Sequence, residues 1–179
     1  MRIIAGEFKG RRLKVPKWDG LRPTSDKLRE TLFNLLAPRT AGATVLDVFA
    51  GTGAVGLESL SRGASHVVFV EQDRRAADLI HANAALCGAD NRCAIIRDRA
   101  ERALQRAIAD APFDIIVLDP PYDFGPLAEV LASAIRHLAP GGVLVLEHAS
   151  RRAVPPLAGA RPTRTIRSGD SALTMIERV

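Results

Sequence analysis

The chain has 179 residues, of which 47% are hydrophobic and 25% charged, and a formal net charge of +5. This composition is typical of a globular protein with a sizeable core, and no stretch approaches the roughly 20 apolar residues of a membrane span. With two cysteines, four scattered histidines and no long apolar run after Met1, we expect a cytoplasmic protein without a disulfide, metal site or membrane anchor.

Positive charge is concentrated at the start of the chain. Residues 1–39 contain ten Lys or Arg and four Asp or Glu, a net charge of +6, whereas residues 40–179 contain fifteen and sixteen, a net charge of −1. A basic segment attached to a nearly neutral remainder favours contact with a polyanion. The alternative is a solvated charged face that binds nothing.

Two short apolar stretches, at residues 3–4 and 13–15, flank a basic stretch that contains glycines. This pattern predicts a small hairpin. Phe8 and Trp18 could stack on unpaired bases, although packing against the core is the expected fate of each. Four cations are predicted on or near the turn: Lys9, Arg11, Arg12 and Lys14.

A helical pattern follows the hairpin. Thr24 or Ser25 is the expected N-cap, and Pro38 is expected to end the helix. We therefore expect a basic N-terminal extension, hairpin plus helix, over residues 1–40 and a second domain over residues 41–179. Four leucines fall on one face of the predicted helix: Leu28, Leu32, Leu35 and Leu36.

From residue 44 onward, strand and helix patterns alternate. This order predicts an α/β fold with a parallel sheet, helices on both faces and a ligand site at the carboxyl ends of the strands. After residue 150, two strand-like stretches at 163–167 and 172–177 predict a hairpin at the edge of the sheet. The predicted strands are 44–49, 66–71, 93–97, 113–119 and 142–147, and the predicted helices are 54–62, 73–87, 100–110 and 124–138.

A glycine loop follows the first of these strands. Gly51, Gly53 and Gly56 match the pattern of dinucleotide sites, and Glu71, at the end of the next strand, can accept both hydroxyls of a ribose. These features suit NAD and S-adenosylmethionine equally. Asp47, just before the loop, would oppose a pyrophosphate but attract the ammonium of a methionine moiety, so the sequence favours S-adenosylmethionine.

The second chemical motif is Asp119-Pro-Pro-Tyr122, directly after the largely apolar run at 113–118. Two prolines make the end of this strand stiff, because both φ angles are fixed. Methyl transfer to an amine on a base needs acceptors for the amine hydrogens and a ring on which the base stacks. The Asp119 carboxylate and the Pro120 carbonyl are the expected acceptors, and Tyr122 is the expected ring.

These residues resemble a known family. The segments 47–53 (Asp-Val-Phe-Ala-Gly-Thr-Gly) and 119–122 are similar to those of class I, Rossmann-like amino-methyltransferases. The segments 22–36, beginning Arg-Pro-Thr-Ser-Asp-Lys, 2–6 (Arg-Ile-Ile-Ala-Gly) and 169–173 (Gly-Asp-Ser-Ala-Leu) resemble the RsmD family, bacterial enzymes that methylate guanine N2 in small-subunit ribosomal RNA. This resemblance covers essentially the whole chain.

The resemblance implies a mostly parallel seven-stranded sheet with one antiparallel strand, and S-adenosylmethionine as cofactor. Glu71 would hold the ribose, and Asp98 would accept from the adenine amine. Arg99 departs from the small residue that the family usually has after this aspartate. The implied cofactor-binding residues are Asp47, Phe49, Gly51, Gly53, Glu71 and Asp98.

The resemblance also implies a substrate, 16S ribosomal RNA or the small ribosomal subunit, whose target guanine must be unpaired or extruded to be reached. No metal is expected to take part, and a monomer is expected. The implied catalytic residues are Asp119, Pro120 and Tyr122. The implied RNA contacts are Lys9, Arg11, Arg12, Arg22 and Lys27.

Two other functions compete with this one. A methyltransferase for another amine, such as adenine N6 in DNA or a protein glutamine, would share the Asp-Pro-Pro-Tyr motif. A non-catalytic RNA-binding module with the same fold would normally have lost Asp47, Glu71 or Asp119, and all three are present.

Overall fold

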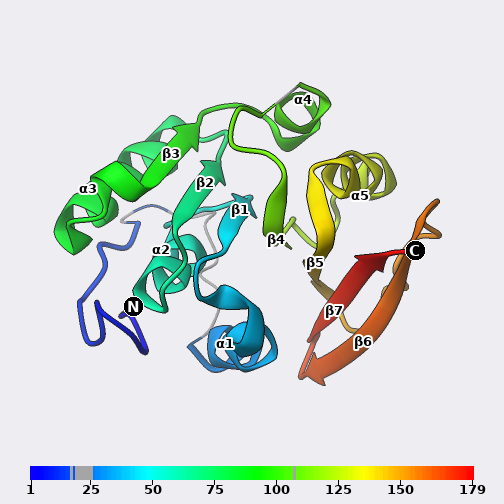
Figure 1. Ribbon diagram of the computed structural model, residues 1–179, viewed down its shortest axis with the longest axis horizontal. Coiled ribbons are helices and arrows are strands. Elements are labelled where there is room, and N and C mark those ends of the chain that lie inside the picture. The colour runs from blue at the N-terminus through cyan, green and yellow to red at the C-terminus, as the bar shows by residue number, and fades with distance from the viewer. Residues whose placement is uncertain (17, 19–25, 107) are drawn as a thin grey trace.

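A mixed sheet forms the centre of the computed structural model, which describes residues 1–16, 18, 26–106 and 108–179 (Figure 1). In this described part of the chain the sheet has seven strands in the order β3-β2-β1-β4-β5-β7-β6, and β7 alone runs antiparallel to the other six. The predicted fold is therefore confirmed. The strands are β1 (Thr44–Val48), β2 (His66–Val70), β3 (Cys93–Ile96), β4 (Phe113–Leu118), β5 (Leu138–Ala149), β6 (Ala160–Ser168) and β7 (Ser171–Arg178).

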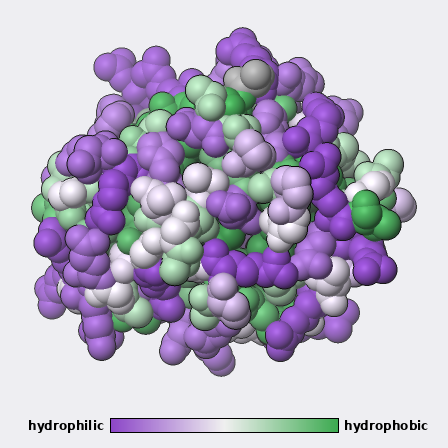
Figure 2. Space-filling view, viewed as in Figure 1, coloured by the Kyte–Doolittle hydropathy of each residue, from purple (hydrophilic) through white to green (hydrophobic). Residues whose placement is uncertain are grey.

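Helices cover both faces of the sheet, and each face has its own hydrophobic cluster. One cluster joins the sheet to α1 (Asp26–Thr40), α2 (Ala54–Ser61) and α3 (Arg74–Cys87). The other joins it to α4 (Ala100–Gln105) and α5 (Leu127–Arg136). Among the described residues, no helix is long and apolar enough to cross a membrane. The face drawn in Figure 2 is mainly hydrophilic, with smaller apolar areas between the hydrophilic side chains.

Strand β1 is buried on both faces of the sheet, and all but one of its buried side chains are apolar. Val45, Leu46 and Val48 are fully buried, and alternate side chains enter opposite clusters because successive side chains of a strand point to opposite faces. This alternation directs Asp47 to the face that α1 and α2 cover. A charged residue thus stands in an otherwise apolar strand, beside the loop that begins α2.

The first residues fold back on themselves and pack on α2. A single antiparallel bridge joins Arg2 and Arg12. The predicted hairpin is therefore present only as this one bridge. Ile3, Phe8 and Leu13 are buried in the same cluster as α1 and α2, so Phe8 packs in the core. The division near residue 40 stays a prediction, but both parts share this cluster.

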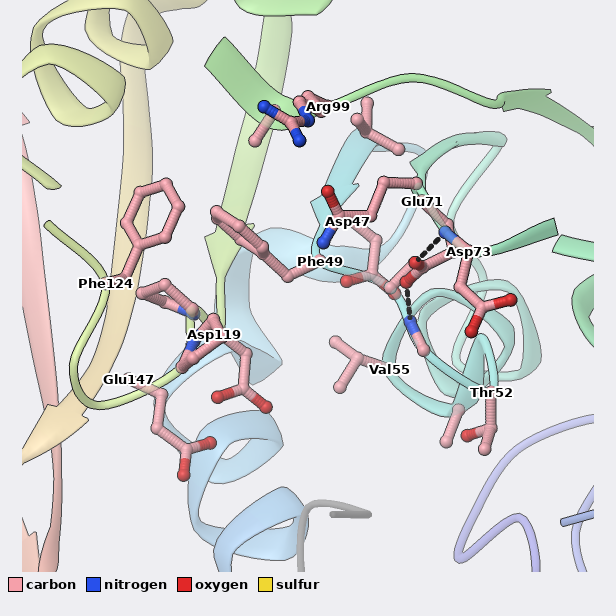
Figure 3. A pocket seen from close by; sticks show the side chains of 18 of the residues that line it. Asp47, Phe49, Thr52, Val55, Glu71, Asp73, Arg99, Asp119, Phe124 and Glu147 are labelled. Atoms are coloured by element: carbon pink, nitrogen blue, oxygen red, sulfur yellow. Dashed lines mark hydrogen bonds between the residues drawn. The ribbon is translucent and has the colours of Figure 1, made fainter. Parts of the chain in front are cut away.

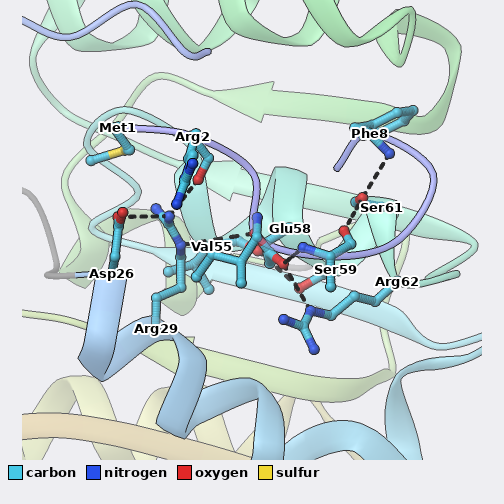
Figure 4. Close-up of polar contacts among 12 residues, drawn as sticks. Met1, Arg2, Phe8, Asp26, Arg29, Val55, Glu58, Ser59, Ser61 and Arg62 are labelled. Atoms are coloured by element: carbon cyan, nitrogen blue, oxygen red, sulfur yellow. Dashed lines mark hydrogen bonds and ion pairs between the residues drawn. The ribbon is translucent and has the colours of Figure 1, made fainter. Parts of the chain in front are cut away.

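Glu58 of α2 holds the first segment in place (Figure 4). Its fully buried carboxylate accepts from the amides of Ile4 at 2.7 Å and Ala5 at 3.0 Å, and from Arg62 Nε at 2.8 Å. Arg29 of α1, also fully buried, donates to the Arg2 carbonyl at 2.6 Å. Buried ionic groups require such partners, because an unpaired buried charge costs several kcal/mol.

Several element boundaries differ from expectation. Pro38 does not end its helix: α1 continues to Thr40, because a proline in the last turn removes only one amide bond and the Thr40 hydroxyl donates to the Leu36 carbonyl at 2.9 Å. Helix α5 begins at Leu127 instead of 124, since Pro126 disfavours helical geometry at the residue before it. The expected N-caps, Thr24 and Ser25, lie outside the described residues.

Strand β5 begins at Leu138, four residues earlier than expected, and runs to Ala149. Pro140 and Gly141 resemble a turn in sequence, but in the structure they lie where the pairing of β4 with β5 shifts register between Phe113 and Ile115. Helix α4 ends at Gln105 rather than at 110. An irregularity within a strand carries the same glycine and proline signals as a turn.

Candidate active site

A cavity of about 680 Å³ lies at the carboxyl ends of the parallel strands (Figure 3). This volume lies within the range of roughly 300–1,000 Å³ that is usual for sites of small molecules and cofactors. The cavity brings together most of the predicted site residues. Its lining includes Asp47, Phe49, Gly51, Glu71, Asp98, Asp119, Pro120 and Tyr122.

The loop after β1 turns sharply beneath the cavity. Gly51 and Gly53 have positive φ values of 56° and 76°, and Phe49, which is not a glycine, has a φ of 64°. Backbone strain of this kind often occurs at ligand sites. Gly53 is the N-cap of α2 and does not line the cavity. A Cβ at Gly56 would lie 2.2 Å from Cε1 of Phe69, so this third glycine serves helix–strand packing.

Asp47 is buried at the start of the loop, with 2% of its surface exposed. Its Oδ2 accepts from the Gly56 amide at 2.9 Å, which ties β1 to the first turn of α2. Burial raises the pKa of Asp47 to about 8, and the charges of Asp119 and Glu71 act in the same direction, against the Gly56 amide, which lowers it. An ammonium group in the cavity would offset this cost of ionisation.

Glu71 connects the end of β2 to the glycine loop. Its Oε2 accepts from the Gly51 amide at 2.9 Å, and its Oε1 accepts from the Asp73 amide at 2.8 Å. These bonds orient the carboxylate along the cavity wall. A carboxylate offers about four acceptor positions, so each oxygen can accept one further hydroxyl.

Asp98 lies at the edge of the cavity and is engaged by arginines. Its Oδ1 accepts from the Arg99 amide at 2.8 Å and from the Arg102 guanidinium, and Arg106 lies 3.5 Å from Oδ2. The hydrogen bond from Arg102 is the main reason that the pKa of Asp98 lies below its usual range. An adenine amine would therefore meet an ionised carboxylate, and Arg99 also lines the cavity.

The other end of the cavity is formed by the loop after β4. The Tyr122 hydroxyl lies 2.5 Å from Ser171 Oγ at the start of β7, and the ring is 36% exposed. Arg152 donates to the carbonyls of Tyr122 at 2.7 Å and Phe124 at 3.1 Å. The C-terminal part of the sheet thus holds the Asp-Pro-Pro-Tyr loop in place.

Several lining residues were not predicted. Phe124 packs edge-on against Phe49, with ring centroids 5.0 Å apart, and joins the two loops of the cavity. Glu147, at the end of β5, is 8% exposed, and Ser171 lines the cavity beside Tyr122. Glu147 follows the buried apolar run of β5, much as Glu71 and Asp119 follow those of β2 and β4, so the same signal could have found it.

Among the described residues, the predicted RNA contacts lie outside the cavity lining. Lys9, Arg12 and Lys27 are exposed. Arg11 is also exposed, but its guanidinium donates to the Leu86 carbonyl and lies 5.6 Å from the centre of the Phe8 ring. Arg22 lies outside the described residues.

Trp18, half-buried, does line the cavity, and the Arg75 guanidinium lies 4.8 Å from its ring centre. Core packing and base stacking of Trp18 both stay predictions.

The strand order, the glycine loop after β1 and the acidic residues at successive strand ends define a class I methyltransferase. A solved structure described as a putative methyltransferase, yhhF, from Escherichia coli has a TM-score of 0.88 and 36% identity, and the match covers 99% of this chain and 97% of that one.

Sequence relatives identify the family. The family model described as Conserved hypothetical protein 95 matches residues 1–177, so the chain belongs to this family, and the predicted kinship with the RsmD enzymes is confirmed. A putative rRNA methyltransferase, YlbH, of Bacillus subtilis is 37% identical, over 89% of this chain and 88% of its own length. Ribosomal RNA small subunit methyltransferase D of Escherichia coli is 44% identical, over 73% of this chain and 65% of its own length.

Proposed function

We propose that the protein transfers a methyl group from S-adenosylmethionine to the exocyclic N2 amine of one guanine in 16S ribosomal RNA. One observation carries this proposal: a single cavity has Asp47 and Glu71 at one end and Asp119 and Tyr122 at the other. The name of the Escherichia coli relative, a small-subunit rRNA methyltransferase, supports the choice of RNA.

The residues at the first end suit the cofactor. Asp47 is a buried carboxylate whose ionisation is costly until a cation lies beside it, which matches the ammonium of a methionine moiety. Glu71 is oriented by two backbone amides and can accept the ribose hydroxyls. Asp98 is held in its ionised form and can accept from the adenine amine.

The residues at the second end suit a purine amine. When bound, S-adenosylmethionine supplies a sulfonium methyl: the N2 lone pair bonds to the methyl carbon, and the carbon–sulfur bond breaks with its electron pair on sulfur. Asp119 and the Pro120 carbonyl accept the N2 hydrogens and align the lone pair. Tyr122 stacks on the base, and the proton that N2 loses passes to Asp119 or to solvent.

The exposed cations of the first segment and of α1 suit the RNA backbone. Lys9, Arg12 and Lys27 are on the surface, where phosphates can reach them. The acceptor amine must enter a cavity at the sheet edge, so the target guanine has to leave any base stack. Backbone contacts would hold the RNA while the base occupies the pocket.

A deletion strain tests the proposal directly. Small-subunit RNA from this strain is digested to nucleosides and compared by mass spectrometry with wild-type RNA. We expect one N2-methylguanosine to be lost, to return with the wild-type gene and to stay absent with Asp119→Ala. An unchanged N2-methylguanosine content, with loss of a methyladenine or of protein glutamine methylation, would refute the proposal in favour of another amine.

A further inference from the structure

Glu147 is a second carboxylate at the acceptor end of the cavity, and the reaction described above does not use it. Its side chain is 8% exposed and lines the same cavity as Asp119 and Tyr122. In Figure 3 the carboxylates of Glu147 and Asp119 point toward the same region of the cavity. Both lie beyond the buried apolar runs of neighbouring strands.

The register of the sheet explains why these two carboxylates face the same way. Strands β4 and β5 are parallel, and their ladder ends with Leu118 paired to Leu146. Asp119 and Glu147 each follow by one residue, which places them on the same face of the sheet with their backbones about 4.8 Å apart. Leu28 of α1 lines the cavity on this face.

Two neighbouring carboxylates offer several acceptor positions, and a ligand edge that carries several N–H donors is complementary to them. The Watson–Crick edge of guanine is such an edge, because it presents the N1 hydrogen beside the two hydrogens of N2. Adenine and cytosine present a lone pair next to their exocyclic amines. Uracil has a ring N–H but no amine.

We infer that Glu147 selects guanine by accepting the N1 hydrogen of the base whose N2 amine is bound by Asp119. This inference rests on the proposed function and names the residue that reads the base. A base with an acceptor at N1 would set its lone pair against the largely buried carboxylate of Glu147, which is the kind of mismatch that enzymes discriminate against strongly. The bond to N1 also leaves more electron density for N2.

The test compares two acceptors in one RNA. After the target has been mapped in the deletion strain, its small-subunit RNA is joined from fragments with guanosine or 2-aminopurine ribonucleoside at that position, as free RNA or as the reconstituted subunit. 2-Aminopurine keeps the N2 amine but has a lone pair at N1. We expect the wild-type enzyme to prefer guanosine by roughly 100-fold or more in kcat/KM.

Glu147→Gln assigns this preference to one side chain. Its amide can donate to the N1 lone pair of 2-aminopurine, so kcat/KM should fall at least about 10-fold with guanosine, and the preference should shrink to a few-fold. Asp123→Asn is the matched control, because this exposed carboxylate follows Tyr122 but does not line the cavity. Its preference should equal that of the wild type.

Two results would overturn the inference: equal use of both acceptors by the wild-type enzyme, which needs no folded variant, or a wild-type preference in Glu147→Gln. The affinity of Glu147→Gln for S-adenosylhomocysteine, expected to be unchanged, reports that the variant folds. Failure of the proposed function looks different, because the wild-type enzyme would then form no N2-methylguanosine in the RNA that carries guanosine.

Discussion

Asp47 shows how a single residue can link cofactor binding to protonation. In the folded chain its pKa is about 8, against an ordinary value of 3.8, chiefly because it is buried. Because the folded pKa lies above the unfolded one, the stability that Asp47 contributes is complete below about pH 4 and is lost as the pH rises toward 8. The buried carboxyl therefore favours its protonated form, and an ammonium beside it would favour the ionised form instead.

Binding of S-adenosylmethionine at about pH 6.5 should therefore release close to one proton from the wild-type protein. The affinity should rise as the pH increases from about 6 toward the pKa of Asp47, since less work is then needed to ionise the carboxylate. Calorimetry in two buffers with different heats of ionisation measures the number of protons released.

Asp47→Asn is the control for this measurement, because the amide does not titrate. This variant should bind more weakly and release almost no proton. Equal proton release by the two proteins would show that another group accounts for the protonation change.

The acidic residues at the strand ends were largely predictable from sequence. Glu71 and Asp119 each follow a buried apolar run, and Asp47 interrupts one; an ionisable residue at such a point is unusual enough to identify a site. Glu147 follows the same rule but was missed, because no motif surrounds it. The arginine pair on Asp98 could not have been predicted, since Arg102 and Arg106 reach it through the geometry of the helix.

At the scale of elements, the Asp-Pro-Pro-Tyr loop depends on a distant part of the chain. Arg152, which follows β5, donates to two carbonyls of this loop, and Ser171 of β7 contacts the Tyr122 hydroxyl. The prolines stiffen the loop locally, but these contacts determine where the Tyr122 ring lies. Arg152 is in this sense a positioning residue.

Arg152→Gln should raise KM for the RNA about tenfold while kcat and the affinity for S-adenosylmethionine change little. The reason is that two hydrogen bonds from a charged donor, together worth on the order of 1–2 kcal/mol, would no longer hold the stacking ring. Steady-state kinetics with small-subunit RNA separates these quantities.

Arg151→Gln is the matched control, because this neighbouring arginine is exposed and the substitution removes the same charge. It should change KM much less than Arg152→Gln. Equal effects from both substitutions would mean that charge toward the RNA matters and the position of Tyr122 does not.

Element boundaries show where sequence reasoning loses precision. Apolar runs predicted the central strands β1, β2, β4 and β5, because burial on both faces leaves a nearly uninterrupted apolar signal. Pro38 was interpreted as the end of a helix, yet α1 continues past it, and the strand expected at 142–147 begins at Leu138 and contains Pro140. A proline in the sequence does not show whether hydrogen bonds to the rest of the fold will let a helix or strand continue past it.

At the scale of the whole molecule, the basic first segment is part of the core as well as the proposed surface for RNA. Glu58 and the buried side chains of Ile3, Phe8 and Leu13 attach it to α2. Removing the segment would therefore expose apolar surface and leave buried groups unpaired. The role of its charge is better tested by substitutions at exposed positions than by truncation.

Replacing Lys9, Arg12 and Lys27 together by glutamine should weaken RNA binding and its salt dependence without unfolding the protein. If each residue contacts one phosphate, the slope of log affinity against log salt should decrease by about 2, at roughly 0.7 per contact. Filter binding between about 50 and 200 mM salt measures the slope.

Thermal unfolding is the control for this triple variant and should match the wild type, because all three side chains are exposed. An unchanged slope in a folded variant would place the RNA-binding surface elsewhere on the molecule.

The central claim is that Asp119 acts on the acceptor amine at one end of a cavity whose other end holds the cofactor. Single-turnover transfer of a labelled methyl group to small-subunit RNA tests it most directly, with S-adenosylmethionine affinity measured separately. Asp119→Asn should show whether an acceptor oxygen suffices or the charge is needed. Asp119→Ala should lose methyl transfer and retain its affinity for S-adenosylmethionine. The reason is that Asp119 acts on the attacking amine, whose attack geometry is reached only in the transition state. Transfer by Asp119→Ala at the wild-type rate would contradict the account.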